Sequence, residues 1–151
     1  NTLEQCMSNF FDYVELDKDR ICRNCKIRGN ASKYSLLGER PILITSLKRF
    51  NAQSQKISKK VTFPLENLSL HKLMKEKSNV CSGTQYSLFA VINHFGRSSE
   101  SGHYVLFMRS SEKWYKFNDE IIEEIRKESI VSSNAYTLIY IDREKFEELG
   151  T

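Results

Sequence analysis

Residues 86–119, YSLFAVINHFGRSSESGHYVLFMRSSEKWYKFND, decide the architecture of this chain. Residues 86–93 form a nearly continuous apolar run, which is typical of a strand buried on both faces. The glycine- and serine-rich stretch at 95–102 predicts a loop. Two further strand-like segments follow, at 103–109 and 114–118. Successive short strands joined by brief connections indicate an antiparallel sheet.

Helices are predicted on both sides of this strand-rich part. Residues 2–14 place apolar side chains at helical spacing, and Thr2 with Gln5 has the spacing of a capping box. Residues 135–141 read as a last core strand and residues 144–149 as a terminal helix. The remaining elements are shorter: strands at 42–47, 61–63 and 68–70, and a helical turn at 121–127. We therefore expect an α+β fold, mainly an antiparallel sheet with a helix at each end.

The bulk composition narrows the class of protein. The chain has 151 residues, 40% of them hydrophobic, which suits one packed domain or part of one. No apolar run approaches the roughly 18 residues that cross a bilayer, and no secretory signal opens the chain. The net charge is only +4, and the lysine-rich stretches at 59–60 and 72–77 lack the interleaved aromatics of a nucleic-acid groove.

These observations predict a location and exclude partners. With no secretory signal, the four cysteines are expected to be reduced thiols, so we expect an intracellular protein, cytoplasmic and/or nuclear. No membrane or nucleic-acid partner is expected. Because the first residue is Asn1, we expect the chain to begin inside a longer parent.

The predicted hairpin from His103 to Asn118 brings reactive side chains together. Residues 110–113 separate its apolar segments and are the natural place for the turn. A turn at Ser110-Ser111 places His103 opposite Asn118, and a three-residue turn places it opposite Asp119. Directly opposed residues on antiparallel strands share a face, with Cβ atoms about 4.5–5.5 Å apart. Either register sets a histidine beside an amide or a carboxylate.

That pairing has a chemical use. Histidine titrates near neutrality, with an unperturbed pKa of about 6.5, so it can take a proton and return it. An oxygen acceptor on one ring nitrogen fixes the tautomer and leaves the other nitrogen as a base. A cysteine thiolate is the usual nucleophile beside such a base. The alternative is structural: a surface histidine and an Asn-Asp pair that forms a turn. Taken alone, these residues favour the structural alternative.

A known family has these residues in this order. Ser101-Gly102-His103-Tyr104, followed by Trp114 to Asp119, resembles the histidine box of the ubiquitin-specific proteases. Six further segments of this chain resemble other blocks of that family and follow the same order: residues 3–10, 21–33, 41–50, 61–64, 86–94 and 135–140. Each block is weak evidence by itself, but together they span nearly the whole chain and make the resemblance specific.

The resemblance implies a fold, an activity and roles for residues. The fold is the papain-like palm portion of a catalytic domain, incomplete without the N-terminal lobe that carries the cysteine. The activity is thiol-dependent cleavage of the (iso)peptide bond after ubiquitin's C-terminal glycine, so ubiquitin and ubiquitinated proteins are the expected partners. His103 would be the general base, Asn118 the third triad member and Asp119 a helper. Gly102 and Tyr104 would line the channel for ubiquitin's Gly-Gly tail.

Two parts of the family pattern are incomplete here. The chain contains no Gly-Asn-Thr-Cys-type box for the nucleophile, and Cys6 and Cys81 are expected to be structural. The chain alone is therefore expected to be inactive, with the nucleophile in a missing N-terminal segment. Cys22 and Cys25 form one zinc knuckle, whereas structural zinc takes four ligands. We expect half of a structural zinc site, completed in the intact parent, and no cofactor for catalysis.

Alternative functions and the domain organisation complete the expectations. One alternative is an inactive ubiquitin-binding pseudoprotease, or a fragment acting as an interaction module. Another is a small zinc-ribbon module in which the hairpin is purely structural. The domain prediction is that residues 1–151 are the C-terminal part of one catalytic domain. Within it, residues 1–30 supply a helix and the second half of a zinc-finger region, and residues 31–151 the palm with the histidine box.

Overall fold

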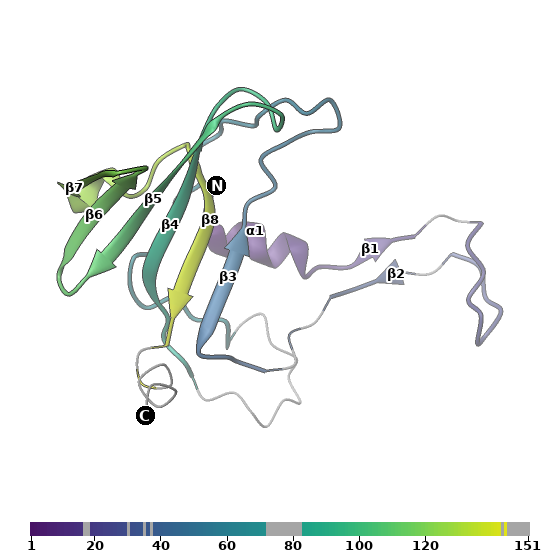
Figure 1. The fold of residues 1–151 in the computed structure, drawn as a ribbon. Coiled ribbons are helices and arrows are strands. Elements are labelled where there is room, and N and C mark those ends of the chain that lie inside the picture. The colour runs from purple at the N-terminus through teal and green to yellow at the C-terminus, as the bar shows by residue number, and fades with distance from the viewer. Residues whose placement is uncertain are drawn as a thin grey trace.

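One antiparallel sheet dominates the computed structural model, which describes residues 1–16, 19–29, 31–34, 36, 38–71, 83–142 and 144. Its strands are β3 (Ile42–Ser46), β4 (Ser87–Phe95), β5 (His103–Ser110), β6 (Lys113–Asn118), β7 (Ile121–Ile125) and β8 (Ala135–Ile141). They lie in the order β3-β8-β4-β5-β6-β7, and every neighbouring pair is antiparallel (Figure 1). The expected α+β fold is confirmed. The predicted helix at 144–149 lies outside the described residues except for Glu144.

Helix α1 (Leu3–Phe10) packs beneath this sheet. Its capping box forms as predicted: the Thr2 hydroxyl accepts from the Gln5 amide at 3.2 Å, and the Gln5 side chain accepts from the Thr2 amide at 3.0 Å. Leu3 and Met7 are buried against the sheet. The helix is shorter than the predicted 2–14, because the Asp12 carboxylate bonds the Tyr13 amide at 2.8 Å and thereby competes with helical hydrogen bonding.

Three other segments differ from the elements that the sequence predicted. Residues 121–127 were expected to be helical, but Ile121–Ile125 is strand β7, and only Lys127–Ser129 forms a 3-10 turn, η2. A tight turn at Asp119-Glu120 folds this segment back along β6, so cross-strand pairing overrides its local preference. The segments at 61–63 and 68–70 make only isolated bridges, Thr2 with Thr62 and Leu68 with Tyr86. They line the core as extended chain.

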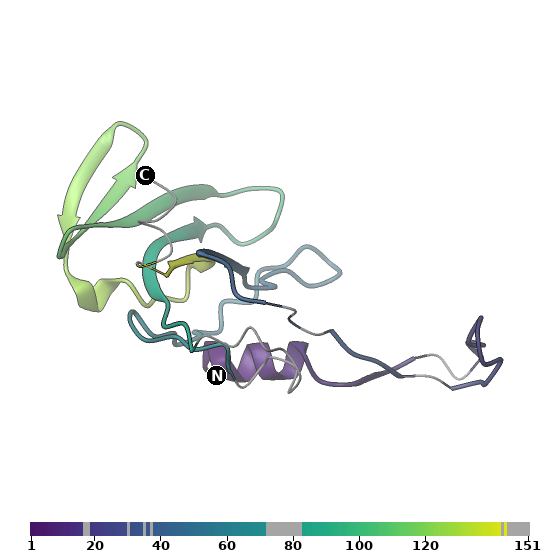
Figure 2. The same cartoon turned by 90° about the horizontal axis from the view of Figure 1, so that it is seen from below.

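The hydrophobic core lies between α1, the segment at 61–70 and one face of the sheet. Leu88 and Val91 of β4, and Leu138 and Tyr140 of β8, are fully buried there. The Tyr140 hydroxyl donates to the Pro64 carbonyl at 2.8 Å, which ties the covering segment to the sheet. Within the described residues, no element covers the opposite face (Figure 2).

That opposite face, which we call the open face, is apolar. Directly paired residues share a face, so the register aligns two apolar rows across the sheet. One row runs Ile44–Ile139–Ala90–Met108, and the other runs Ile92–Leu106–Phe117–Ile122. Ile44 is 65% exposed and Ile122 61%, and the residues between them are mostly half-buried. The sequence prediction of a central strand that is apolar on both faces therefore agrees with the arrangement.

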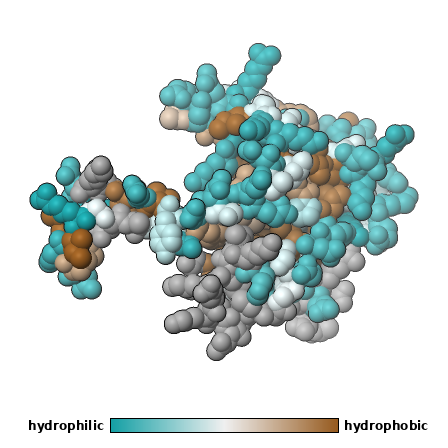
Figure 3. Space-filling view, turned by 180° about the vertical axis from the view of Figure 1, so that it is seen from behind, coloured by the Kyte–Doolittle hydropathy of each residue, from teal (hydrophilic) through white to brown (hydrophobic). Residues whose placement is uncertain are grey.

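A slender arm projects from the body of the molecule (Figure 1). It is based on β1 (Val14–Glu15) paired with β2 (Ala31–Ser32), and it carries Cys22 and Cys25 beyond them. Hydrophobic side chains also surface on it (Figure 3), among them Val14, Ile21 and Ile27. In the described part of the chain, no helix is long and apolar enough to cross a membrane.

Candidate active site

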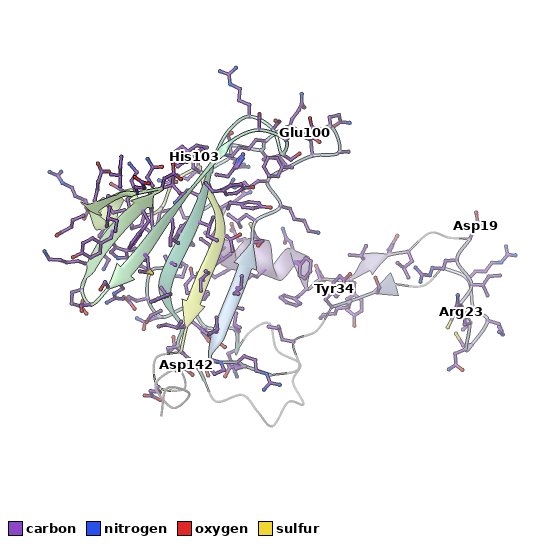
Figure 4. All side chains as sticks on the ribbon, in the orientation of Figure 1. Asp19, Arg23, Tyr34, Glu100, His103 and Asp142 are labelled. Carbon is purple, nitrogen blue, oxygen red and sulfur yellow. The ribbon has the colours of Figure 1, made fainter. Side chains whose placement is uncertain are left out.

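His103 begins β5, where the sheet meets the loop at 96–102 (Figure 4). It pairs with Phe95, the last residue of β4, so the two strands hold its backbone in the ladder. Its side chain is 48% exposed. An imidazole in this position is fixed at its base and open at its tip, which suits a group that exchanges protons with a bound molecule.

Neither register expected for the hairpin is correct. The turn is Ser111-Glu112, with Ser110 opposite Lys113, and the ladder between β5 and β6 runs as far as Leu106 opposite Phe117. Ser111 adopts a left-handed φ of 54°, which closes this two-residue turn. Continuing that register places His103 opposite Glu120.

Asn118 nonetheless reaches His103. It lies two positions before Glu120 in the continued register, so it shares a face with His103 as a diagonal neighbour. His103 Nε2 and Asn118 Oδ1 are 2.5 Å apart. Since an amide oxygen can only accept, Nε2 carries the hydrogen and donates it. The other ring nitrogen, Nδ1, is then the one that can accept a proton.

Asp119 reaches the same ring nitrogen from the turn. Its backbone has a φ of 52°, a left-handed conformation that turns the chain between β6 and β7. That turn brings Asp119 Oδ2 to 3.7 Å from His103 Nε2, with the aspartate side chain 77% exposed. The carboxylate is therefore a second, more solvated neighbour of Nε2, and both oxygens approach Nε2 and not Nδ1.

An aromatic cluster adjoins the histidine. Tyr104 is 53% exposed, and its ring lies 4.9 Å from that of His94 on β4. Phe50 packs edge-on against His94 at 5.4 Å, and Tyr136 lies 6.2 Å from Tyr104. Sequence reasoning singled out Tyr104 and Gly102 but missed Phe50, His94 and Tyr136 as neighbours. Residues 50 and 136 are so distant in sequence that no local signal joins them.

The loop at 96–102 is paired with a second loop. The Ser99 amide donates to the Ser54 carbonyl at 3.0 Å, and the Lys56 amide donates to the Arg97 carbonyl at 2.9 Å. The Lys56 ammonium also donates to the His94 carbonyl, and to Asn134 Oδ1 at 3.1 Å. The loop at 96–102 is thus held through its backbone by residues 54–56.

Cys22 and Cys25 form a compact turn at the tip of the arm. The Cys22 carbonyl accepts from the Lys26 amide at 3.0 Å, and the Cys22 amide donates to the Ile27 carbonyl at 2.9 Å. Hydrogen bonds from the backbone amides of Cys25 and Asn24 lower the pKa of the Cys22 thiol. This environment favours a thiolate, the form that binds metals.

Two thiols supply half of a tetrahedral zinc site. Among the described residues, no group of three or more metal-binding side chains gathers, so His71 and His94 do not complete it. Figure 4 labels Arg23, between the two thiols, at the far end of the arm from His103. Cys6 is partly buried against the core, and Cys81 lies outside the described residues. Neither knuckle thiol is therefore placed to serve His103.

Comparisons with known proteins agree with one another. The sequence profile of the ubiquitin carboxyl-terminal hydrolase family matches residues 4–140. Ubiquitin carboxyl-terminal hydrolase 20 of Arabidopsis thaliana is 33% identical over 145 residues, which cover 93% of this chain and 21% of that relative. The chain therefore spans about a fifth of the length of this curated relative.

Solved structures give the same result. A SAGA DUB module with Ubp8, Sgf11, Sus1 and Sgf73 is similar with a TM-score of 0.78 at 26% identity, over 93% of this chain and 33% of that one. A form of the module bound to monoubiquitin is similar with a TM-score of 0.78 at 26% identity, over 93% of this chain and 32% of that one. This chain thus spans about a third of those chains.

Proposed function

This chain belongs to the ubiquitin carboxyl-terminal hydrolase family, and from that premise we propose that it supplies the histidine side of a cysteine deubiquitinase. Its parent would cleave the (iso)peptide bond after the C-terminal glycine of ubiquitin, with ubiquitin and ubiquitinated proteins as partners. The observation that carries this proposal is the contact of 2.5 Å between His103 Nε2 and Asn118 Oδ1. It fixes the tautomer and leaves Nδ1 as a base.

The proposed chemistry assigns a role to each residue. Nδ1 of His103 takes the proton of a cysteine thiol, and the thiolate attacks the carbonyl carbon of ubiquitin's last glycine. The imidazolium then gives its proton to the leaving amine, and His103 next activates the water that hydrolyses the thioester. Asn118 holds the ring in place throughout. Asp119 supports the positive charge when the ring is protonated.

The tail of ubiquitin would approach across Gly102 and Tyr104. Gly102 is exposed, so its backbone would be open to an extended peptide beside His103. Tyr104 presents a half-exposed ring on the next position of β5. A glycine-glycine tail has no side chains of its own, so a narrow channel would admit it and reject bulkier sequences.

The nucleophile would come from an N-terminal segment outside this chain. Two observations support a parent with further parts. The open face is an apolar sheet surface of the kind that marks an interface, and the chain spans only about a fifth of the curated relative. We propose that another part of the parent covers the open face. The cysteine-bearing lobe would approach His103 from the other face, which His103 shares with Val105 and Phe107 of β5. Residues 1–30 would then belong to a zinc-finger region and residues 31–151 to the palm.

Zinc is proposed as a structural ion of the parent. The N–H···S hydrogen bonds that lower the pKa of Cys22 suit a metal knuckle, and two further ligands would come from outside this chain. Zinc would order the arm and take no part in the reaction. Reduced thiols of this kind are expected inside the cell, in the cytoplasm and/or nucleus.

A ubiquitin C-terminal fluorogenic amide tests the proposal. The 151-residue chain alone should give no turnover, and a form extended to include the upstream cysteine segment should hydrolyse the amide. His103→Ala in the extended form should abolish turnover, whereas Glu120→Ala, in the exposed turn beside Asp119, should not. Turnover that survives His103→Ala would refute the assignment.

The inactive pseudoprotease is the second candidate. Its motivation is that the chain itself contains no Gly-Asn-Thr-Cys-type box for a nucleophile. In that case the extended form would bind ubiquitin without hydrolysing it. The same assay, run beside a ubiquitin-binding titration, separates the two functions.

A further inference from the structure

His94 is buried directly beneath the approach to His103. Its side chain is 1% exposed, and its ring is enclosed by Tyr104 at 4.9 Å, Phe50 at 5.4 Å and Tyr136 at 6.4 Å. Its backbone is held as well. The amide of His94 donates to the Asn134 carbonyl at 2.9 Å, and its carbonyl accepts from the Lys56 ammonium. The backbone of His94 is thus hydrogen-bonded, and its ring is packed among three aromatic side chains.

Gly102 rests on that ring. A Cβ added at Gly102 would lie 2.2 Å from His94 Nε2, 2.7 Å from His94 Cε1 and 2.9 Å from the Phe95 carbonyl oxygen. Gly102 does not adopt a left-handed φ, so the backbone conformation by itself does not require glycine there. The close approach of the His94 ring does.

The contact fixes the residue before His103. Gly102 and His103 share a peptide plane, and planarity transmits the position of one to the other. On its far side, the His103 ring is held by Asn118 at 2.5 Å. The imidazole of His103 is thus positioned by two contacts. The His94 ring holds the backbone just before His103, and the Asn118 amide holds the His103 ring.

The chemistry of His94 matches a positioning role better than a structural one. Its Nδ1 is buried, and no hydrogen-bond partner for it is found within the described residues. Burial, and then the neighbouring Lys56 ammonium, lower the pKa of this histidine, so the ring is neutral at neutral pH. An apolar side chain would fill the same space without leaving a nitrogen unpaired.

We propose that His94 is a positioning residue for His103: its ring seats the Gly102 backbone and so sets the place from which His103 reaches Asn118. As a role in catalysis, this inference rests on the function proposed above. The physical coupling from His94 through Gly102 to His103 does not, and it can be measured in the 151-residue chain without any activity.

A double-mutant cycle tests the coupling. His94→Ala and Gly102→Ala should each weaken the bond between His103 and Asn118, seen by NMR as faster exchange of the His103 Nε2 proton and a changed imidazole nitrogen shift. Removing the His94 ring makes room for the methyl group, so the double variant should lose much less than the sum of the single effects. If His94→Ala does not fold, Gly102→Ala alone still tests the coupling. An unchanged His103 NMR signal in that variant would contradict it.

Gly96 is the matched control. A Cβ there would lie 2.4 Å from the Ser101 carbonyl oxygen and 2.8 Å from the Gly102 Cα, both backbone atoms, and only then 2.9 Å from His94 Cε1. Gly96→Ala should therefore remain disruptive in the His94→Ala background. Three outcomes would each overturn the proposal. The effects of His94→Ala and Gly102→Ala on the His103 NMR signal could be additive, or His94→Ala could reduce the effect of Gly96→Ala as much as that of Gly102→Ala. The third is a His103 signal that His94→Ala leaves unchanged.

The extended, active form provides the catalytic readout. His94→Ala should lower kcat by roughly 10- to 100-fold, the cost of a small misplacement of a catalytic group, with a much smaller change in KM. A purely structural role would lower Tm and leave kcat of the folded enzyme unchanged, and that result would overturn the catalytic part. If the NMR coupling is present and the extended form never hydrolyses ubiquitin substrates, the proposed function fails and the coupling stands.

Discussion

Asn118 and Asp119 should contribute unequally to the reaction, and the structure sets the order. His103 Nε2 lies 2.5 Å from Asn118 Oδ1 and 3.7 Å from Asp119 Oδ2, and the Asp119 side chain is 77% exposed. The perturbation is Asn118→Ala or Asp119→Ala in the extended, active form. Each removes one oxygen from the same nitrogen and leaves the strands that carry His103 in place.

The magnitudes follow from the two contacts. During the reaction the ring is an imidazolium, so its bond to Asn118 is a charged hydrogen bond that contributes about 1.5–3 kcal/mol. At about 1.36 kcal/mol per factor of ten, Asn118→Ala should lower kcat roughly 10- to 150-fold. The exposed pair with Asp119 contributes about 0–1 kcal/mol. Asp119→Ala should therefore cost at most about 5-fold.

The assay is steady-state hydrolysis of a ubiquitin C-terminal fluorogenic amide, with Glu120→Ala as the control from the same turn. The double variant should lose less than the product of the two single losses, because a ring that is already misaligned gains little from the remaining oxygen. A larger loss for Asp119→Ala than for Asn118→Ala would refute the reasoning from distances. Full activity in the double variant would show that this hairpin is only a scaffold.

Three further predictions need only the 151-residue chain. Tyr140→Phe should lower the free energy of unfolding by about 1–2 kcal/mol, measured by urea unfolding, because the part-buried Pro64 carbonyl loses its donor. The lowered pKa of His94 means that the unfolded chain binds a proton more readily than the folded one. Stability should therefore fall as pH drops from about 6.5 toward the lower pKa of the folded state, and His94→Phe should flatten this dependence while His71→Gln, at an exposed site, does not. Ile44→Lys and Ile122→Lys, on the open face, should reduce self-association in sedimentation velocity relative to Lys60→Ala on the hydrophilic surface. Unchanged self-association in both isoleucine variants would mean that the open face is not the surface through which the chains associate.

The sequence by itself determined the sheet and the contents of the site. The apolar run at 86–93 became most of β4, because a strand with few polar side chains on either face is stable only between neighbours. The capping box of Thr2 and Gln5 placed the start of α1, since its hydrogen bonds span only three residues. One of the two registers expected for the hairpin put His103 and Asn118 on one face. The observed register does so too, because it differs from that one by two residues and strands alternate with a period of two.

Tertiary structure decided what depends on distant parts of the chain. The helical turn expected at 121–127 became β7 because β6 offered an unpaired edge. The register of the hairpin was set by a left-handed Ser111, which local composition does not specify.

The ring of His94 under Gly102 is the clearest example of a tertiary effect. His94 lies at the end of β4, Phe50 follows β3, and Tyr136 belongs to β8. Only the packing of the His94 ring, held among Phe50 and Tyr136 and placed against Gly102, shows why position 102 is glycine. A sequence pattern reports periodicity along one element, whereas close packing between elements depends on distances that exist only after the sheet has formed.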